Sequence, residues 1–122
     1  MHCGSCLCGA VSFRLLSEPK AVTNCHCIMC QKQHGAAFAT YASVPRSDIE
    51  YLSGQELLTA FNSSARVIRK FCGVCGSNIE WSGSEKFPEW LSIAVASLDT
   101  NFEPKSVKDI YLESRVCWLQ NS

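Results

Sequence analysis

The chain has 122 residues, 47% of them hydrophobic, and its 11 Lys and Arg residues balance its 11 Asp and Glu residues to a formal net charge of zero. This length and composition predict a single domain, residues 1–122, with a hydrophobic core of its own. Because no basic run and no apolar stretch of about 20 residues occurs, the sequence argues against nucleic-acid partners and membrane partners.

The predicted elements are mostly strands. Residues 10–15 alternate apolar and polar side chains, which is typical of a strand with one buried face. Further strands, separated by turns rich in Gly, Pro, Asn and Ser, are predicted at residues 21–24, 36–43, 49–52, 57–61, 65–71, 79–81, 90–98 and 109–112. Residues 90–98 are the most apolar and are expected to form a central strand. One short helical turn is expected at residues 31–34, ended by Gly35, so the sequence predicts a mainly β fold of antiparallel strands with little helix.

Seven of the nine cysteines form three clusters along the chain. The clusters are Cys6 and Cys8; Cys25, Cys27 and Cys30; and Cys72 and Cys75. Residues two apart in an extended strand are separated by about 6.6 Å, whereas two sulfurs on one zinc ion lie about 3.8 Å apart. We therefore expect the first pair to lie in a turn before the strand at residues 10–15.

The cluster sizes suggest two unlike metal sites. Structural zinc sites take about four protein ligands, while catalytic sites keep about three and leave one position open. The most economical partition places Cys6, Cys8, Cys72 and Cys75 on one metal ion and Cys25, Cys27 and Cys30 on another. Closing the chain between residues 9 and 71 costs about 4 kcal/mol of entropy. Zinc binding to four thiolates contributes roughly 10 to 16 kcal/mol and exceeds that cost.

The three-cysteine site has a distinctive chemistry. One zinc ion and three thiolates carry a net negative charge, so the ion is a poor Lewis acid for making hydroxide from water. Such a centre suits a small substrate thiol, which would bind the open position as a nucleophilic thiolate and attack an aldehyde carbon. Donors or cations are needed to offset the charge, and the candidates by sequence proximity are His26, Lys32, His34, Arg69 and Lys70.

Other readings of the cysteines remain open. The first residues lack the basic and apolar regions of a secretory signal, so we expect a cytoplasmic protein, in which thiols are metal ligands or free. A secreted disulfide-bonded fold is the alternative, and it would leave one of nine thiols unpaired. The two CxxC pairs could also be redox dithiols.

Several residues outside the clusters carry weaker expectations. Cys3 and Cys117 are predicted to be ordinary thiols, although either could complete the central metal site and close it. His26, between two predicted ligands, is expected to face solvent or to support the ligands. His2 and His34 are expected at the surface, and the three tryptophans in the core or at its rim.

Four motifs follow one another along the chain: Cys6-x-Cys8-Gly9, Cys25-His26-Cys27-x-x-Cys30, Phe71-Cys72-x-x-Cys75-Gly76-Ser77 and Ser97-Leu98-Asp99. Together they resemble the signature of the glutathione-dependent formaldehyde-activating enzyme family, which includes centromere protein V. The chain departs from the family pattern at Ala96, where Gly is frequent, and at Asp109 and Cys117, where His and Pro are common.

The resemblance implies a β-tent fold similar to the zinc domains of Mss4-like proteins. It also implies two zinc ions per chain, a structural ion on the four outer cysteines and a catalytic ion on the three central ones. The implied activity is that of a carbon-sulfur lyase that forms or breaks S-(hydroxymethyl)glutathione, with glutathione as the small thiol and formaldehyde as the aldehyde. A non-catalytic zinc-stabilised binding module and a lyase acting on another thiol adduct remain as alternatives.

Overall fold

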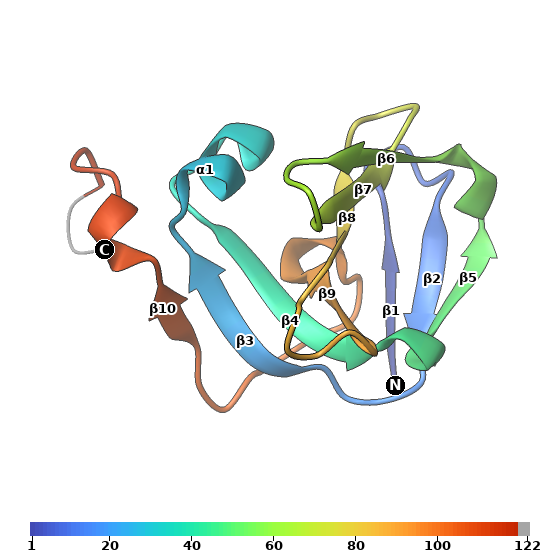
Figure 1. The fold of residues 1–122 in the computed structure, drawn as a ribbon. Coiled ribbons are helices and arrows are strands. Elements are labelled where there is room, and N and C mark those ends of the chain that lie inside the picture. The colour runs from blue at the N-terminus through green and yellow to red at the C-terminus, as the bar shows by residue number, and fades with distance from the viewer. Residues whose placement is uncertain (120–122) are drawn as a thin grey trace.

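The computed structural model describes residues 1–119, and its strands form two sheets (Figure 1). The predicted domain extends to residue 122, and its last three residues lie outside the described part. The smaller sheet has the order β1 (His2–Ser5), β2 (Ser12–Leu15), β5 (Ile49–Ser53). The larger sheet has the order β10 (Lys108–Ile110), β3 (Lys20–Cys25), β4 (Ala39–Pro45), β9 (Trp90–Ala94), β8 (Asn78–Ser82), β7 (Ile68–Cys72), β6 (Leu58–Asn62).

The prediction of a mainly β fold with little helix is confirmed. One α-helix, α1 (Ile28–His34), and four short 3-10 turns accompany the strands of residues 1–119. The 3-10 turns are η1 (Arg46–Asp48), η2 (Gln55–Leu57), η3 (Val95–Ser97) and η4 (Leu112–Ser114). Within the described chain, no helix combines the length and the apolar character needed to cross a bilayer.

Some predicted boundaries are wrong. β9 is central in the larger sheet, as expected. It ends at Ala94, because the Ser97 hydroxyl donates a hydrogen bond to the Ala94 carbonyl at 2.6 Å and the chain turns into η3. The last strand ends at Ile110 because Tyr111 adopts a left-handed conformation with φ of 58°. This strand, β10, pairs with β3 in parallel, whereas the other strand pairs are antiparallel.

The main core lies where the two sheets meet. Phe13 and Leu15 from the small sheet are fully buried with Ile79 and Ile93 from the large one. Two cysteines of the outer pairs, Cys6 and Cys72, belong to the same cluster. A second, smaller cluster contains Cys25, Cys30, Ala39, Tyr41 and Ala94. Each group of cysteines is therefore anchored in packed hydrophobic surroundings.

The register of the large sheet aligns one row of residues across five strands. The row consists of Lys20, Ser43, Ser92, Trp81 and Arg69, on β3, β4, β9, β8 and β7. Partners directly opposite each other point to the same face of a sheet, and so do residues two apart on one strand. Tyr41 and its partner Thr23 therefore share this face with the row. The same face carries the site described below.

Candidate metal centre

The four outer cysteines converge although they come from distant parts of the sequence. The sulfurs of Cys6, Cys8, Cys72 and Cys75 all lie within 4.8 Å of one another. The Cys8 sulfur lies 3.6 Å from that of Cys6 and 3.9 Å from that of Cys72. Zinc with four sulfurs at about 2.3 Å in a tetrahedron requires sulfurs about 3.8 Å apart. The donor set and its spacing therefore fit a zinc ion.

Local backbone structure explains how each pair is presented. Cys6 and Cys8 lie in a turn closed by a hydrogen bond from the Gly9 amide to the Cys6 carbonyl (3.0 Å), as the spacing argument predicted. Gly9 has φ of 80°, which glycine adopts without strain. On the other side, Cys72 ends β7 and Cys75 lies in the turn before β8.

The three central cysteines form a second group, again with all sulfurs within 4.8 Å of one another. Cys25 ends β3, Cys27 is the N-cap of α1, and Cys30 lies in its first turn. The Cys27 sulfur accepts a hydrogen bond from the Cys30 amide at 3.3 Å, which satisfies a free donor of the first turn. The helix therefore begins at Ile28, before the predicted start at residue 31, and ends at Gly35 as predicted.

Arg69 supplies the positive charge beside the central group. Arg69 is 3% exposed, and its Nη1 donates to the Cys30 sulfur at 3.5 Å and to the side-chain oxygen Oε1 of Gln33 at 2.9 Å. A hydrogen bond from the Cys25 thiol and then the Arg69 guanidinium lower the pKa of Cys30 to about 5, against the opposing effect of burial. Two other cations were expected here from sequence proximity. Lys32 is exposed, and Lys70, the neighbour of Arg69 on β7, lies on the opposite face of that strand.

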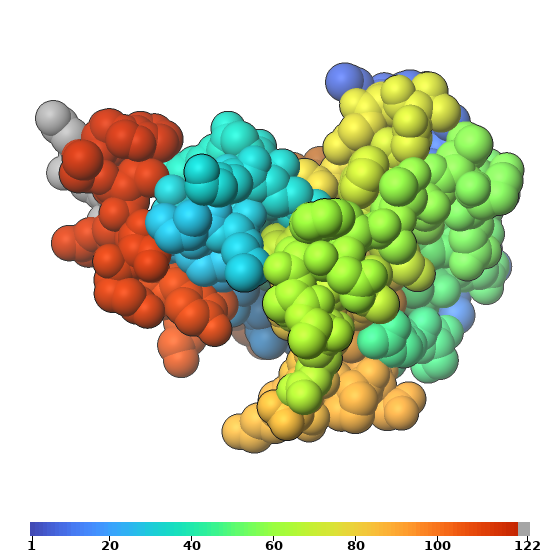
Figure 2. All heavy atoms as spheres, turned by 45° about the horizontal axis from the view of Figure 1, so that its top comes forward, coloured from blue at the N-terminus to red at the C-terminus, as the bar shows by residue number. Residues whose placement is uncertain are grey.

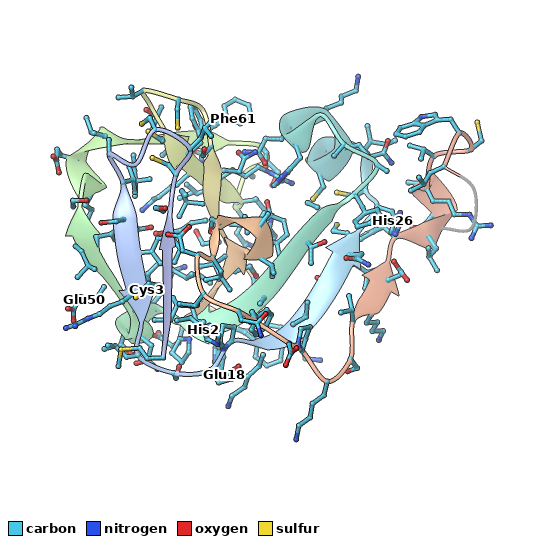
Figure 3. All side chains as sticks on the ribbon, turned by 180° about the vertical axis from the view of Figure 1, so that it is seen from behind. His2, Cys3, Glu18, His26, Glu50 and Phe61 are labelled. Carbon is cyan, nitrogen blue, oxygen red and sulfur yellow. The ribbon has the colours of Figure 1, made fainter. Side chains whose placement is uncertain are left out.

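His26 supports the site rather than facing solvent. Its side chain is 1% exposed, and Nε2 donates to Oδ1 of Asp109 at 2.9 Å. This hydrogen bond, helped by one from the Asn24 amide, lowers the pKa of Asp109. Figure 3 shows His26 at the end of β3 beside the C-terminal segment. The solvent-facing expectation is wrong because the parallel pairing of β10 with β3 covers His26, which a local reading of the sequence does not show.

Of the other two histidines, His2 is buried, contrary to the prediction of a surface position, and His34 is half-buried. Nε2 of His34 is hydrogen bonded to the Tyr41 hydroxyl at 2.8 Å, and burial, with the positive charge of Arg69, lowers the pKa of His34. His2 is buried, with its Nε2 at 3.1 Å from Oε2 of Glu18 and its Nδ1 at 2.7 Å from the Thr100 hydroxyl. Sequence reasoning missed the His2 position because β1, which carries it, is a short strand with no clear alternation.

The two remaining cysteines lie apart from both groups. Cys3 and Cys117 are exposed, and Cys3 lies far from His26 in Figure 3. Over residues 1–119, no further cysteine, histidine or carboxylate joins the three central sulfurs within 4.8 Å. The central group thus has three protein donors, which is one fewer than a closed tetrahedral zinc site requires.

A cavity of about 530 Å³ opens over the three central cysteines. Its walls include Tyr41 and Trp81 from the large sheet and Ile110 and Tyr111 from the C-terminal segment. In Figure 2, α1 lies between this C-terminal segment and the β6–β7 hairpin. Tyr41, Ile110 and Tyr111 were not predicted as site residues, because the pairing of β3 with β4 and β10 brings them to the cysteines, with Tyr111 following directly after β10. A cavity of this volume suits a small organic ligand.

Comparisons with known proteins identify the family and the fold. The family model described as glutathione-dependent formaldehyde-activating enzyme matches residues 1–114. A Halomonas elongata protein that carries this enzyme name provisionally is 26% identical, over 96% of this chain and 78% of its own length. A crystal structure of a Rhodobacter sphaeroides protein superposes with a TM-score of 0.70 at 26% identity, covering 88% of this chain and 98% of that one.

Proposed function

Because the chain belongs to the glutathione-dependent formaldehyde-activating enzyme family, we propose that it is a zinc-dependent carbon-sulfur lyase. It would join a small thiol such as glutathione to formaldehyde or a similar aldehyde, or catalyse the reverse. The observation that carries this proposal is the group of three sulfurs beneath a cavity of about 530 Å³, with no fourth donor within 4.8 Å among the described residues.

The two cysteine groups take different roles in this proposal. The four outer cysteines hold a structural zinc ion, because their sulfurs match a closed tetrahedron. Cys25, Cys27 and Cys30 hold the catalytic zinc ion, which would supply an open position at which a thiol is bound as thiolate. Since three thiolates and one zinc ion carry a net negative charge, the buried guanidinium of Arg69 offsets it before the substrate thiolate adds another.

The protein groups around the cavity shape the reaction. The thiol S–H adds across the aldehyde C=O, so that a C–S bond forms and the thiol proton ends on the former carbonyl oxygen. Tyr41 lines the cavity, and burial, with the negative charge of Cys30, raises the pKa of its hydroxyl, which remains a neutral hydrogen-bonding group. This hydroxyl is hydrogen bonded to Nε2 of His34 at 2.8 Å. The C-terminal segment contributes Ile110 and Tyr111 to the wall of the cavity.

We also propose a cytoplasmic location, where thiols are kept reduced, and a small-molecule substrate rather than a nucleic acid or membrane partner. The formal net charge of zero supports the latter.

The test combines metal counting with catalysis. Protein with two zinc ions should speed the exchange between free formaldehyde and its glutathione adduct, measured by NMR. Cys27→Ser should lose one zinc ion and at least about 100-fold of this rate enhancement while keeping its fold. Cys117→Ser, which alters an exposed thiol outside both groups, is the matched control and should behave as wild type.

The main rival is a zinc-stabilised binding module with no chemistry. It would be favoured if Cys27→Ser kept the full exchange rate, or if that substitution unfolded the protein as a structural ligand change would.

A further inference from the structure

A second cavity, of about 410 Å³, adjoins the one over the central cysteines. Both cavities are lined by Trp81 and Ser92, which are paired across β8 and β9. The second cavity continues along the same face of the sheet to Ser43 and Lys20, which belong to the row described above. The two cavities are therefore neighbours on one face of the sheet, with Trp81 and Ser92 lining both.

The lining of the second cavity is aromatic, with one positive charge. Three aromatic rings come from Trp81, Phe87 and Trp90. The Lys20 ammonium lies 5.8 Å from the centre of the Trp90 ring. Lys20 is the one charged residue in the described lining, so the cavity complements an apolar group that bears a single negative charge.

The backbone beside this cavity contains a β-bulge with a residue in a left-handed conformation. The β3–β4 register shifts between Lys20 and Thr23, and Ala21 in that bulge has φ of 51°. Over residues 1–119, the other non-glycine residue with positive φ is Tyr111, which lines the cavity over the cysteines. Bulges redirect side chains, and strained residues are typical of binding sites. Each of the two cavities is therefore lined by one non-glycine residue with positive φ, Ala21 in the second cavity and Tyr111 in the first.

Neither formaldehyde nor glutathione matches this lining. The formaldehyde carbon bears only hydrogen and leaves the second cavity empty. Glutathione carries two carboxylates, an ammonium group and two amides, whereas the described lining offers one ammonium group and no carboxylate. One of its two carboxylates would lack a cation there, and its other polar groups would have only Ser43, Ser84 and Ser92 as further polar partners.

We propose that the second cavity is a subsite for the substituent of the aldehyde, and that this substituent is an aromatic or bulky alkyl group carrying a carboxylate that pairs with Lys20. The proposal rests on the proposed lyase activity and names its substrate class, the thiol adducts of carboxylated aldehydes. The bond changes are those given above: C–S and O–H bonds form, the S–H bond and the C=O π bond break, and no oxidant or reductant is needed.

Binding can be tested without catalysis, using 4-methylbenzoate, which contains neither thiol nor aldehyde. In NMR spectra of the zinc-loaded protein, the indole N–H signals of Trp81 and Trp90 should shift, and that of the exposed Trp118 should not. The neutral analogue 4-methylbenzamide should shift the same two signals. Shifts that are absent, or equal at all three tryptophans, would overturn the subsite.

Substitutions separate the two parts of the subsite. Lys20→Gln should weaken 4-methylbenzoate binding roughly two- to fivefold and leave 4-methylbenzamide binding unchanged. Lys105→Gln, an exposed lysine that lines a different cavity, is the matched control. Phe87→Ala should weaken both ligands by roughly fivefold or more, and it alters a loop residue that lies outside the hydrophobic core. An equal effect of Lys20→Gln on both ligands would contradict the charge pairing.

Kinetics with glutathione then distinguish this proposal from the activity on which it rests. Lys20→Gln and Phe87→Ala should lower the ratio of kcat/KM for 4-formylbenzoate to that for formaldehyde by roughly threefold or more. If formaldehyde is converted but 4-methylbenzoate does not bind, the subsite is wrong and the lyase stands. If 4-methylbenzoate binds as described but no aldehyde is converted, the lyase is wrong and the subsite stands.

Discussion

At the scale of single residues, Arg69 links the central cysteines to the surrounding structure. Burying a guanidinium is costly unless its donors are satisfied. Arg69 satisfies them with the Cys30 sulfur, the Gln33 side chain and the Ser63 hydroxyl, the last at 2.9 Å from Nε. These contacts come from α1 and from the loop after β6, so the charge beside the metal ligands is held by two different elements.

Removing this charge should weaken the central metal. Arg69→Met keeps an apolar stem of similar length but loses the donors, and we expect about a 10- to 100-fold lower zinc affinity at the three-cysteine site. Competition with a chelator would measure it. Lys70→Met, one residue along and on the opposite face of β7, is the control and should retain wild-type affinity. Equal affinities for Arg69→Met and wild type would contradict the role of Arg69.

The lowered pKa of Cys30 predicts how many protons zinc displaces. With a pKa of about 5, Cys30 is a thiolate at pH 7 and releases no proton when zinc binds. As the pH falls through about 5, protons compete for Cys30 and zinc affinity should drop. Arg69→Met removes one cause of this lowering and leaves the larger one, the Cys25 hydrogen bond, in place, so the pKa of Cys30 should rise and more protons should be released than in wild type. Calorimetry in two buffers of different ionisation enthalpy measures the number, and an unchanged number would refute this account.

At the scale of elements, the C-terminal segment is attached to the site by α1 and β3. The Gln31 side-chain amide donates to the carbonyls of His26 (2.7 Å) and Ser114 (2.8 Å), and the His26 amide donates to the Ile110 carbonyl (3.0 Å). With the His26–Asp109 hydrogen bond, these contacts attach one wall of the cavity over the central cysteines to the rest of the structure.

Gln31→Ala should loosen that wall. The loss of two neutral hydrogen bonds costs about 1 to 3 kcal/mol, so amide hydrogen exchange at residues 108–114 should accelerate by roughly 5- to 100-fold. Gln33→Ala, which removes contacts to Arg69 and Asn78 instead, should leave exchange in this segment unchanged. Unaltered exchange in Gln31→Ala would show that the segment is held by other contacts.

Some elements were predictable and others were not, for identifiable reasons. Alternation located β2 in the small sheet, and turn residues between apolar stretches located most strands of the large sheet. The parallel β10 was not predictable as such, because three residues carry too little pattern and its partner β3 lies far away in sequence. The full length of α1 depends on a thiol as N-cap, which cysteine rarely provides.

Some residues of the candidate site were also predictable from the sequence, and others were not. Close spacing of thiols was enough to group the cysteines, because metal-ligand distances allow few alternatives. Tyr41 and Asp109 were not identified, since they reach the site through strand register, and Asp109 appeared only as a departure from a family pattern.

At the scale of the whole molecule, the four outer cysteines join the two sheets. Cys6 follows the first strand of the small sheet, and Cys72 ends a strand of the large one; both lie in the main core with Phe13 and Ile79. Because the sheets share this core, we propose that residues 1–122 behave as one domain and unfold in a single transition.

Loss of the outer metal should therefore unfold the protein. A structural zinc ion contributes roughly 10 to 16 kcal/mol, which is as large as the total stability of about 5 to 15 kcal/mol for a typical domain. Cys72→Ser should lose NMR signal dispersion, whereas Cys117→Ser should keep it. A folded, metal-free Cys72→Ser protein would disprove the structural role.

The most direct test of the account is cadmium NMR of the cadmium-substituted protein, titrated with glutathione. Two cadmium signals are expected, one from four sulfurs and one from three sulfurs with an exchangeable fourth ligand. Glutathione should move the second signal and leave the first in place. Two four-sulfur signals in the absence of glutathione, both unaffected by its addition, would contradict the open three-cysteine site.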